Sequence, residues 1–73
     1  MAEFKYEVTQ KHGKLSESSK GWTTELRSIS WNEKEAKYDL REWAPNGEKM
    51  GKGITLSTEE LVKLKEFLNN MEI

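Results

Sequence analysis

The sequence predicts an α+β domain in which four antiparallel strands precede one C-terminal helix. Alternating apolar and polar residues over 3–15, and again over 36–44, are typical of half-buried strands. The Pro-Asn-Gly segment at 45–47 indicates a turn, because proline fixes φ and glycine permits positive φ. Ser57 and Glu60 form a capping-box pattern ahead of an apolar helical stripe. The predicted order of elements is therefore β-β-β-β-α.

The segments between these patterns complete the sheet. A loop without apolar side chains over 16–21 separates the first strand from a second at 22–32, which is rich in Trp, Thr, Ile and Ser. A polar turn at 32–35 leads to the third strand, and 50–56 forms the fourth. These connections are short enough for an antiparallel meander. We expect the helix to cover one face of this sheet and to leave the other exposed.

The predicted helix ends near Asn70 and has one apolar face. Five apolar residues fall within one arc of about 120°, and they are Leu61, Leu64, Phe67, Leu68 and Met71. Val62 and Ile73 lie nearly opposite this arc. They are either ordinary exposed apolar residues or part of a dimer interface.

Length and composition restrict the architecture. The chain has 73 residues, of which 12 are Lys or Arg, 13 are Asp or Glu and none is Cys. We expect one domain over 1–73, because independent folding units rarely fall below about 50 residues. Without Cys there is no disulfide framework and no thiolate metal site. Since a core of this size seldom supplies more than about 3–5 kcal/mol, the chain is expected to form a homodimer.

Hydropathy and net charge say less about function. No uninterrupted apolar run is long enough to cross a bilayer or to form a signal-peptide core, so we expect a cytosolic protein without a membrane partner. The formal net charge of −1 does not by itself favour a nucleic-acid partner. The arrangement of the charges on the folded surface has to decide whether a nucleic-acid partner is favoured.

The residues that could support catalysis are few. His12 is the only histidine and Asp39 the only Asp, and nothing in the local sequence activates them for a Ser-His-Asp mechanism. The glycines at 51–53 are too closely spaced for a phosphate-binding loop and lead into a strand. Glu59 and Glu60 are explained as first-turn charges that the helix dipole favours. We therefore expect no enzyme, no cofactor, no metal and no small-molecule substrate.

Aromatic and basic residues share one predicted sheet face. Trp43 has the strand parity of Arg41 and Lys37, and Trp31 has that of Arg27. Such a face suits single-stranded nucleic acid, because bases stack on aromatic rings for about 1–3 kcal/mol each and cations contact the phosphates.

The third tryptophan, Trp22, follows Lys20 and Gly21 at a loop edge. Two other interpretations of the tryptophans remain open. They could be core residues or pack under Lys and Arg stems, or their face could bind a partner protein, since Trp and Arg are common interface anchors.

Residues 39–57, DLREWAPNGEKMGKGITLS, resemble the C-terminal single-stranded DNA-binding domain of the transcriptional coactivator family named after positive cofactor four. That family has an Asp-hydrophobic-Arg-Glu-aromatic strand, a Pro/Gly turn, a Gly-Lys-Gly-Ile-hydrophobic-Leu strand and a capped helix. The good match covers about half the chain, and the order of all elements agrees. The resemblance implies a strongly curved four-stranded sheet and a homodimer that binds single-stranded or locally melted DNA without reading its sequence.

The resemblance also implies roles for individual residues. Arg41 and Lys52 correspond to phosphate-contacting cations, and Trp43 to a stacking aromatic. Trp31 corresponds to a second stacking aromatic, with two basic loop residues beyond it. The full predicted nucleic-acid-binding set is Lys20, Trp22, Arg27, Trp31, Lys34, Lys37, Arg41, Trp43 and Lys52.

Three features depart from the family pattern. The 32–35 turn carries two acidic residues, the first hairpin over 9–21 is long, and the Ser- and Lys-rich tail of eukaryotic members is missing. A stand-alone domain of this kind resembles the bacterial or phage branch. The resulting hypothesis is a non-catalytic, nucleoid-associated homodimer that binds single-stranded DNA in transcription, replication or repair. RNA binding by the same face, or a protein-interaction module, are the alternatives.

Overall fold

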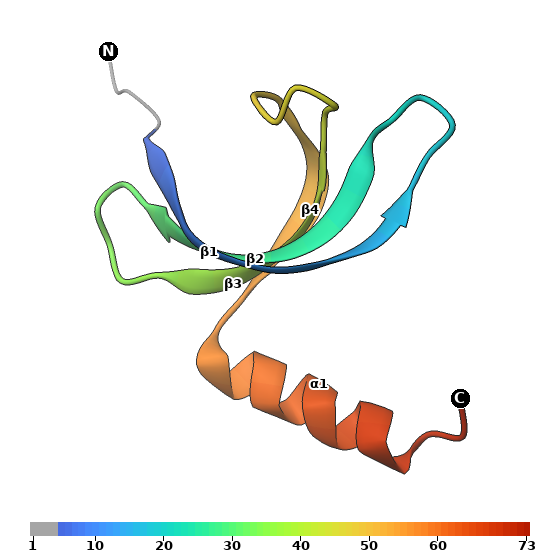
Figure 1. Cartoon of the computed structure of the whole chain (residues 1–73). Helices are drawn as coiled ribbons and strands as arrows, with labels where there is room; N and C mark the ends of the chain where they lie inside the picture. The colour runs from blue at the N-terminus through green and yellow to red at the C-terminus, as the bar shows by residue number, and fades with distance from the viewer. Residues whose placement is uncertain (1–4) are drawn as a thin grey trace.

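The computed structural model describes residues 5–73 and has the predicted order of elements (Figure 1). The four strands and the helix are β1 (Tyr6–Glu17), β2 (Thr23–Trp31), β3 (Lys37–Trp43), β4 (Met50–Leu56) and α1 (Thr58–Asn70). Phe4, part of the alternation that predicts the first strand, lies outside the described residues.

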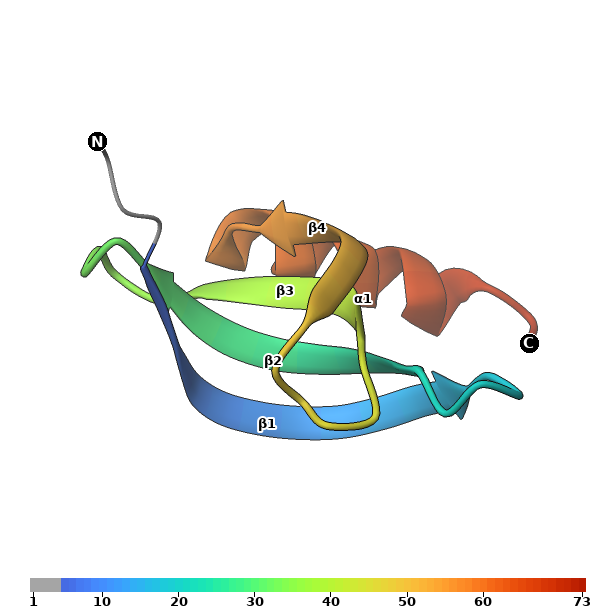
Figure 2. The ribbon, with the colours of Figure 1, turned by 90° about the horizontal axis from the view of Figure 1, so that it is seen from above.

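The strands form one antiparallel sheet in the order β1-β2-β3-β4. The sheet is strongly curved, as the family resemblance implies, and α1 lies on its convex side (Figure 1). Seen from above, the strands follow one another across the sheet in sequence order (Figure 2). The α+β class and the curved four-stranded sheet with its C-terminal helix are thus confirmed.

Irregularities in the edge strands accompany this curvature. The pairing of β1 with β2 shifts register at three places, and the pairing of β3 with β4 shifts once, between Arg41 and Trp43. Each extra residue bends its strand and increases the local twist. The β3–β4 pair also needs a glycine, because a Cβ atom at Gly53 would lie 2.5 Å from the carbonyl oxygen of Leu40.

The sheet has two chemically different faces, which the register defines. Arg27 is paired with Asp39 and Thr23 with Trp43, so these side chains share the concave face. Leu26, Leu40 and Ile54 are aligned across three strands on the convex face. The most deeply buried side chains, Ile29, Asp39 and Trp43, lie on the concave face. The core of this single chain is therefore on the side that the helix does not cover.

The helix begins as predicted and contacts the sheet only lightly. Ser57 Oγ accepts the Glu60 N–H at 3.2 Å, and the Ser57 N–H donates to Glu60 Oε1 at 2.9 Å, which completes the capping box. No helical residue is buried, and Phe67 is 62% exposed. Most of the apolar stripe of α1 thus remains uncovered in one chain.

Candidate nucleic-acid interface

Four charged side chains form a square at the centre of the concave face. Glu25 and Arg27 lie on β2, while Asp39 and Arg41 lie on β3, with Glu25 opposite Arg41 and Arg27 opposite Asp39. Residues two apart on a strand share a face, so each arginine also has a carboxylate beside it on its own strand. We refer to these four residues as the charge square.

Arg41 is held by the carboxylate of Asp39 and by the backbone carbonyl of Gly51. Its Nε donates to Asp39 Oδ2 at 2.8 Å and its Nη2 to Asp39 Oδ1 at 3.1 Å, while Nη1 donates to the Gly51 carbonyl at 3.1 Å. The Thr55 hydroxyl donates to Asp39 Oδ1 at 3.0 Å. These bonds satisfy the fully buried carboxylate and fix the plane of the guanidinium group.

Arg27 makes the equivalent pair with Glu25. Its Nη2 lies 2.7 Å from Glu25 Oε1 and its Nε donates to the same oxygen at 2.8 Å, while the Thr23 hydroxyl donates to Oε2 at 2.6 Å. Burial alone would raise the pKa of Glu25. The hydrogen bonds from Thr23 and Arg27 and the charges of Arg27 and Lys11 outweigh burial, so the pKa of Glu25 is lowered. Glu25 is therefore ionised near neutral pH and compensates the charge of Arg27.

Trp43 lies beneath this square. The Cζ atom of Arg27 is 3.8 Å from the centre of its ring, the Tyr6 ring is 6.1 Å away, and the residue is 1% exposed. Among residues 5–73, no acceptor bonds its indole nitrogen. The base-stacking role assigned to Trp43 from the sequence stays a prediction, and it would require Arg27 to move off the ring.

Trp31, on the same face, is more accessible than Trp43. It is partly exposed, the Tyr6 ring centre is 5.8 Å from its own, and Arg41 Cζ is 5.4 Å from its centre. A partly exposed ring with a fixed guanidinium beside it has the geometry of a stacking platform.

Trp22 lies on the other face of the sheet. A Cβ atom at Gly51 would be 3.3 Å from Trp22 Cζ3 and 3.4 Å from Glu42 Cβ, so the indole ring packs beside these two residues. Glu42 pairs with Thr24 and points away from the face of Trp43. The structure therefore does not bring Trp22 together with Trp31 and Trp43.

The predicted lysines are exposed and lie around the concave face and its loops. Lys37 begins β3 opposite Ile29, and Lys52 lies on β4 where its pairing with β3 is irregular. Lys20 is in the β1–β2 loop and Lys34 in the β2–β3 turn. All four ammonium groups are accessible to a ligand.

Two residues of this face are absent from the set predicted from sequence. Tyr6 pairs with Trp31 and Lys11 pairs with Arg27. Simple alternation puts Lys11 on the face opposite Tyr6, but the register shift between Val8 and Gln10 inverts the parity of β1. No sequence signal marks this bulge.

Within residues 5–73, no group of three or more His, Asp or Glu side chains could hold a metal ion. In the same residues, no helix is both long and apolar enough to cross a membrane.

Comparison with known proteins agrees with this geometry. Residues 18–67 match the family described as Transcriptional Coactivator p15 (PC4). The chain is also 52% identical, over 71 residues, to a protein of Treponema pallidum (strain Nichols) described as uncharacterized; the match covers 97% of this chain and 84% of that protein. The family is one of non-catalytic nucleic-acid-binding domains. The family match over the larger part of the sheet and the helix shows that this chain belongs to the transcriptional coactivator p15 (PC4) family.

Proposed function

We propose that this chain is a homodimeric module that binds single-stranded DNA on its concave face with little sequence preference. The observation that carries the proposal is Trp31, a partly exposed ring on that face with Arg41 beside it. Stacking on an aromatic ring is tolerant of sequence, because every base has a π-face. Duplex DNA hides these faces and would bind less well.

We assign most of the phosphate contacts to the lysines. Arg27 and Arg41 each pair with a carboxylate, so much of their charge is already compensated. Lys37 and Lys52 are exposed and make no ion pair within the described residues, and the same holds for Lys20 and Lys34. We therefore assign to the arginines the fixing of the aromatic rings, and to the lysines most of the phosphate contacts.

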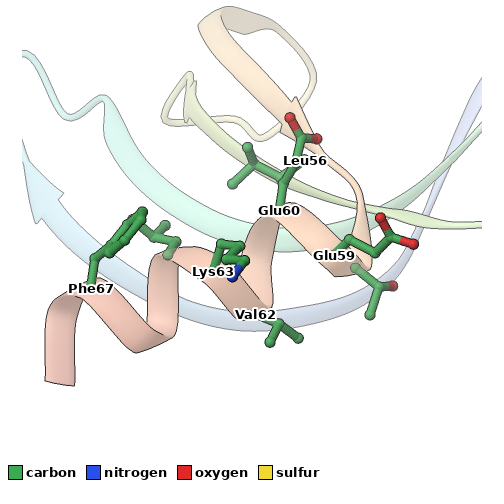
Figure 3. A pocket seen from close by; sticks show the side chains of 8 residues that line it. Leu56, Glu59, Glu60, Val62, Lys63 and Phe67 are labelled. Atoms are coloured by element: carbon green, nitrogen blue, oxygen red, sulfur yellow. The ribbon is translucent and has the colours of Figure 1, made fainter.

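The dimer is proposed from the uncovered apolar surface on the convex side. One groove of about 570 Å³ lies between α1 and the sheet and is lined by side chains such as Leu26, Leu40 and Leu64. A second, of about 720 Å³, lies along α1 and the end of β4 (Figure 3). Exposed contiguous apolar surface of this kind is typical of protein–protein interfaces. A second copy that covers both grooves would bury this apolar surface and leave the concave faces open.

The proposal is tested by titrating the protein with oligo-dT while its tryptophan fluorescence is followed. We expect quenching by oligo-dT that weakens as salt is raised, because phosphate contacts release counterions. A duplex of equal length is the control and should bind less tightly. An oligo-rU that binds better than oligo-dT would indicate RNA as the ligand. No binding of either strand at low salt would reject the proposal in favour of a protein-interaction module.

The proposed cellular role follows from this binding. A module that holds single strands without reading sequence can act wherever duplex DNA is opened, so we place it in transcription, replication or repair.

A further inference from the structure

A polar groove opens on the concave side, between the β1–β2 hairpin and the β3–β4 turn. Its volume is about 490 Å³, within the range of about 300–1,000 Å³ typical of small-ligand sites. Thr23, Glu25 and Arg27 line it from β2, and Lys11 and Glu17 line it from β1. Gly21 of the β1–β2 loop and residues 44–47 of the turn complete the lining. The two loops rise on the same side of the sheet, away from α1 (Figure 1).

Lys11 faces this groove because β1 is irregular. It pairs with Arg27, and three β1 residues later Lys14 pairs with Glu25, although only two residues separate the partners on β2. In a regular strand, Lys11 and Lys14 would point to opposite faces. The register shift brings both to the concave face, where the charge of Lys11 is close enough to lower the pKa of Glu25.

Lys11 differs from its charged neighbours in lacking a paired carboxylate. Lys14 Nζ lies 3.1 Å from Glu17 Oε1, and Arg27 Nη2 lies 2.7 Å from Glu25 Oε1. Among residues 5–73, Lys11 makes no ion pair within 4.0 Å. Its ammonium group is therefore the cation at this groove that an incoming anion can contact without breaking an existing pair.

The wall that Lys11 provides lies outside the segment shared with the family, which begins at residue 18. We propose that this groove is a subsite for one nucleotide of the bound strand, with its phosphate on Lys11 and its base between the β1–β2 hairpin and the turn at 44–47. The proposal rests on the proposed function. Thr23 and Asn46 supply polar groups that can hydrogen bond a base edge.

The phosphate contact is tested by the salt dependence of oligo-dT affinity in variants. Each phosphate contact contributes about 0.7 to the slope of log K against log salt for single strands. Lys11→Ala should lower this slope by about that amount, whereas Lys11→Arg should keep it. Lys14→Ala is the matched control, because Lys14 is an exposed lysine of the same strand whose ammonium group is already paired with Glu17.

Each outcome of this experiment is informative. Lys11 is exposed, so its substitution should leave the fold intact, which circular dichroism checks. A slope for Lys11→Ala equal to that of the wild type would overturn the subsite while the proposed function stands. A wild-type protein that binds no single strand at all would reject both.

The nucleotide is distinguished from a bare anion by three probes used at equal ionic strength: thymidine monophosphate, thymidine and inorganic phosphate. Amide NMR signals of Lys11, Thr23 and Asn46 report occupancy of the groove. We expect thymidine monophosphate to shift all three signals more than either other probe does. Equal shifts with inorganic phosphate would show a phosphate site only and overturn the nucleotide assignment.

Discussion

Arg27 and Arg41 each lie between a carboxylate and an indole ring. Arg27 pairs with Glu25 and covers Trp43, while Arg41 pairs with Asp39 and lies beside Trp31. Removing one partner from a buried ion pair typically costs about 3–5 kcal/mol, because the other charge is left uncompensated. These arginines are therefore as much part of the core as of the binding face.

Alanine substitutions of Trp43 and Trp31 should affect different properties of the protein. Trp43 is almost fully buried, so Trp43→Ala should lower the free energy of unfolding by about 3–5 kcal/mol. Trp31 is partly exposed, and Trp31→Ala should weaken oligo-dT binding by about 1–3 kcal/mol. Urea denaturation measures the first effect, and the fluorescence anisotropy of a labelled oligo-dT measures the second. Unchanged oligo-dT affinity in a folded Trp31→Ala variant would remove the main support for stacking.

The burial of Trp43 illustrates what strand parity can and cannot predict. Its position on the face of Arg41 follows from alternation and is correct. Its burial depends on Arg27, which is 16 residues earlier in the chain and on another strand, so no local pattern contains it. The interpretation that a tryptophan packs under an arginine describes its position in this chain.

At the scale of elements, local signals predicted the fold well. The capping box at Ser57 and Glu60 and the turn at Gly47, where φ is 75°, depend only on residues close in sequence. The faces of β1 depend instead on how its bulges fit β2. Because each extra residue inverts the parity of the residues up to the next bulge, alternation alone predicts the strand but not the face on which Lys11 lies.

The contact of β3 with β4 depends on the missing side chain of Gly53. A Cβ atom there would lie 2.5 Å from the Leu40 carbonyl oxygen and 2.6 Å from Arg41 Cβ, so the two strands would have to separate. We expect Gly53→Ala to destabilise the fold by about 1–3 kcal/mol, as overpacking does. Thermal or urea denaturation measures the change.

Gly13→Ala is the control for this substitution. Gly13 lies in β1, and a Cβ atom there would meet nothing within 4 Å. This variant should keep or slightly raise stability, because alanine restricts the unfolded chain. Equal losses of stability in both variants would show that the close approach of β3 and β4 at Gly53 is not the cause.

The whole molecule has two faces with different tasks. The concave face holds the core and the aromatic and basic groups, and the convex face holds apolar side chains that one chain leaves exposed. Sequence reasoning predicted a thin core and an amphipathic helix, because both follow from composition and periodicity. It could not predict that the core would lie on the face away from the helix, because that depends on how the finished sheet curves.

The proposed dimer can be tested by measuring the mass of the protein in solution. Sedimentation equilibrium at micromolar concentration should give twice the 8.5 kDa of one chain. Phe67 is 62% exposed in the single chain and lies in the proposed interface. Phe67→Glu should therefore shift the mass toward one chain, because the substitution places a charge there. Asn70→Glu adds the same charge at the helix end and is the control. A wild-type mass of one chain would refute the dimer.

Because the core lies on the concave face, stability and ligand binding depend on some of the same residues. A single-stranded nucleic acid bound on the concave face would lie over Trp43 and the charge square. It would then cover the core on the side that the helix leaves open. Any ligand that binds only the folded state raises its stability by mass action. Folding and binding are then linked equilibria. Substitutions of the residues beneath the bound nucleic acid will change both stability and affinity. Substitutions of the exposed lysines will change affinity alone.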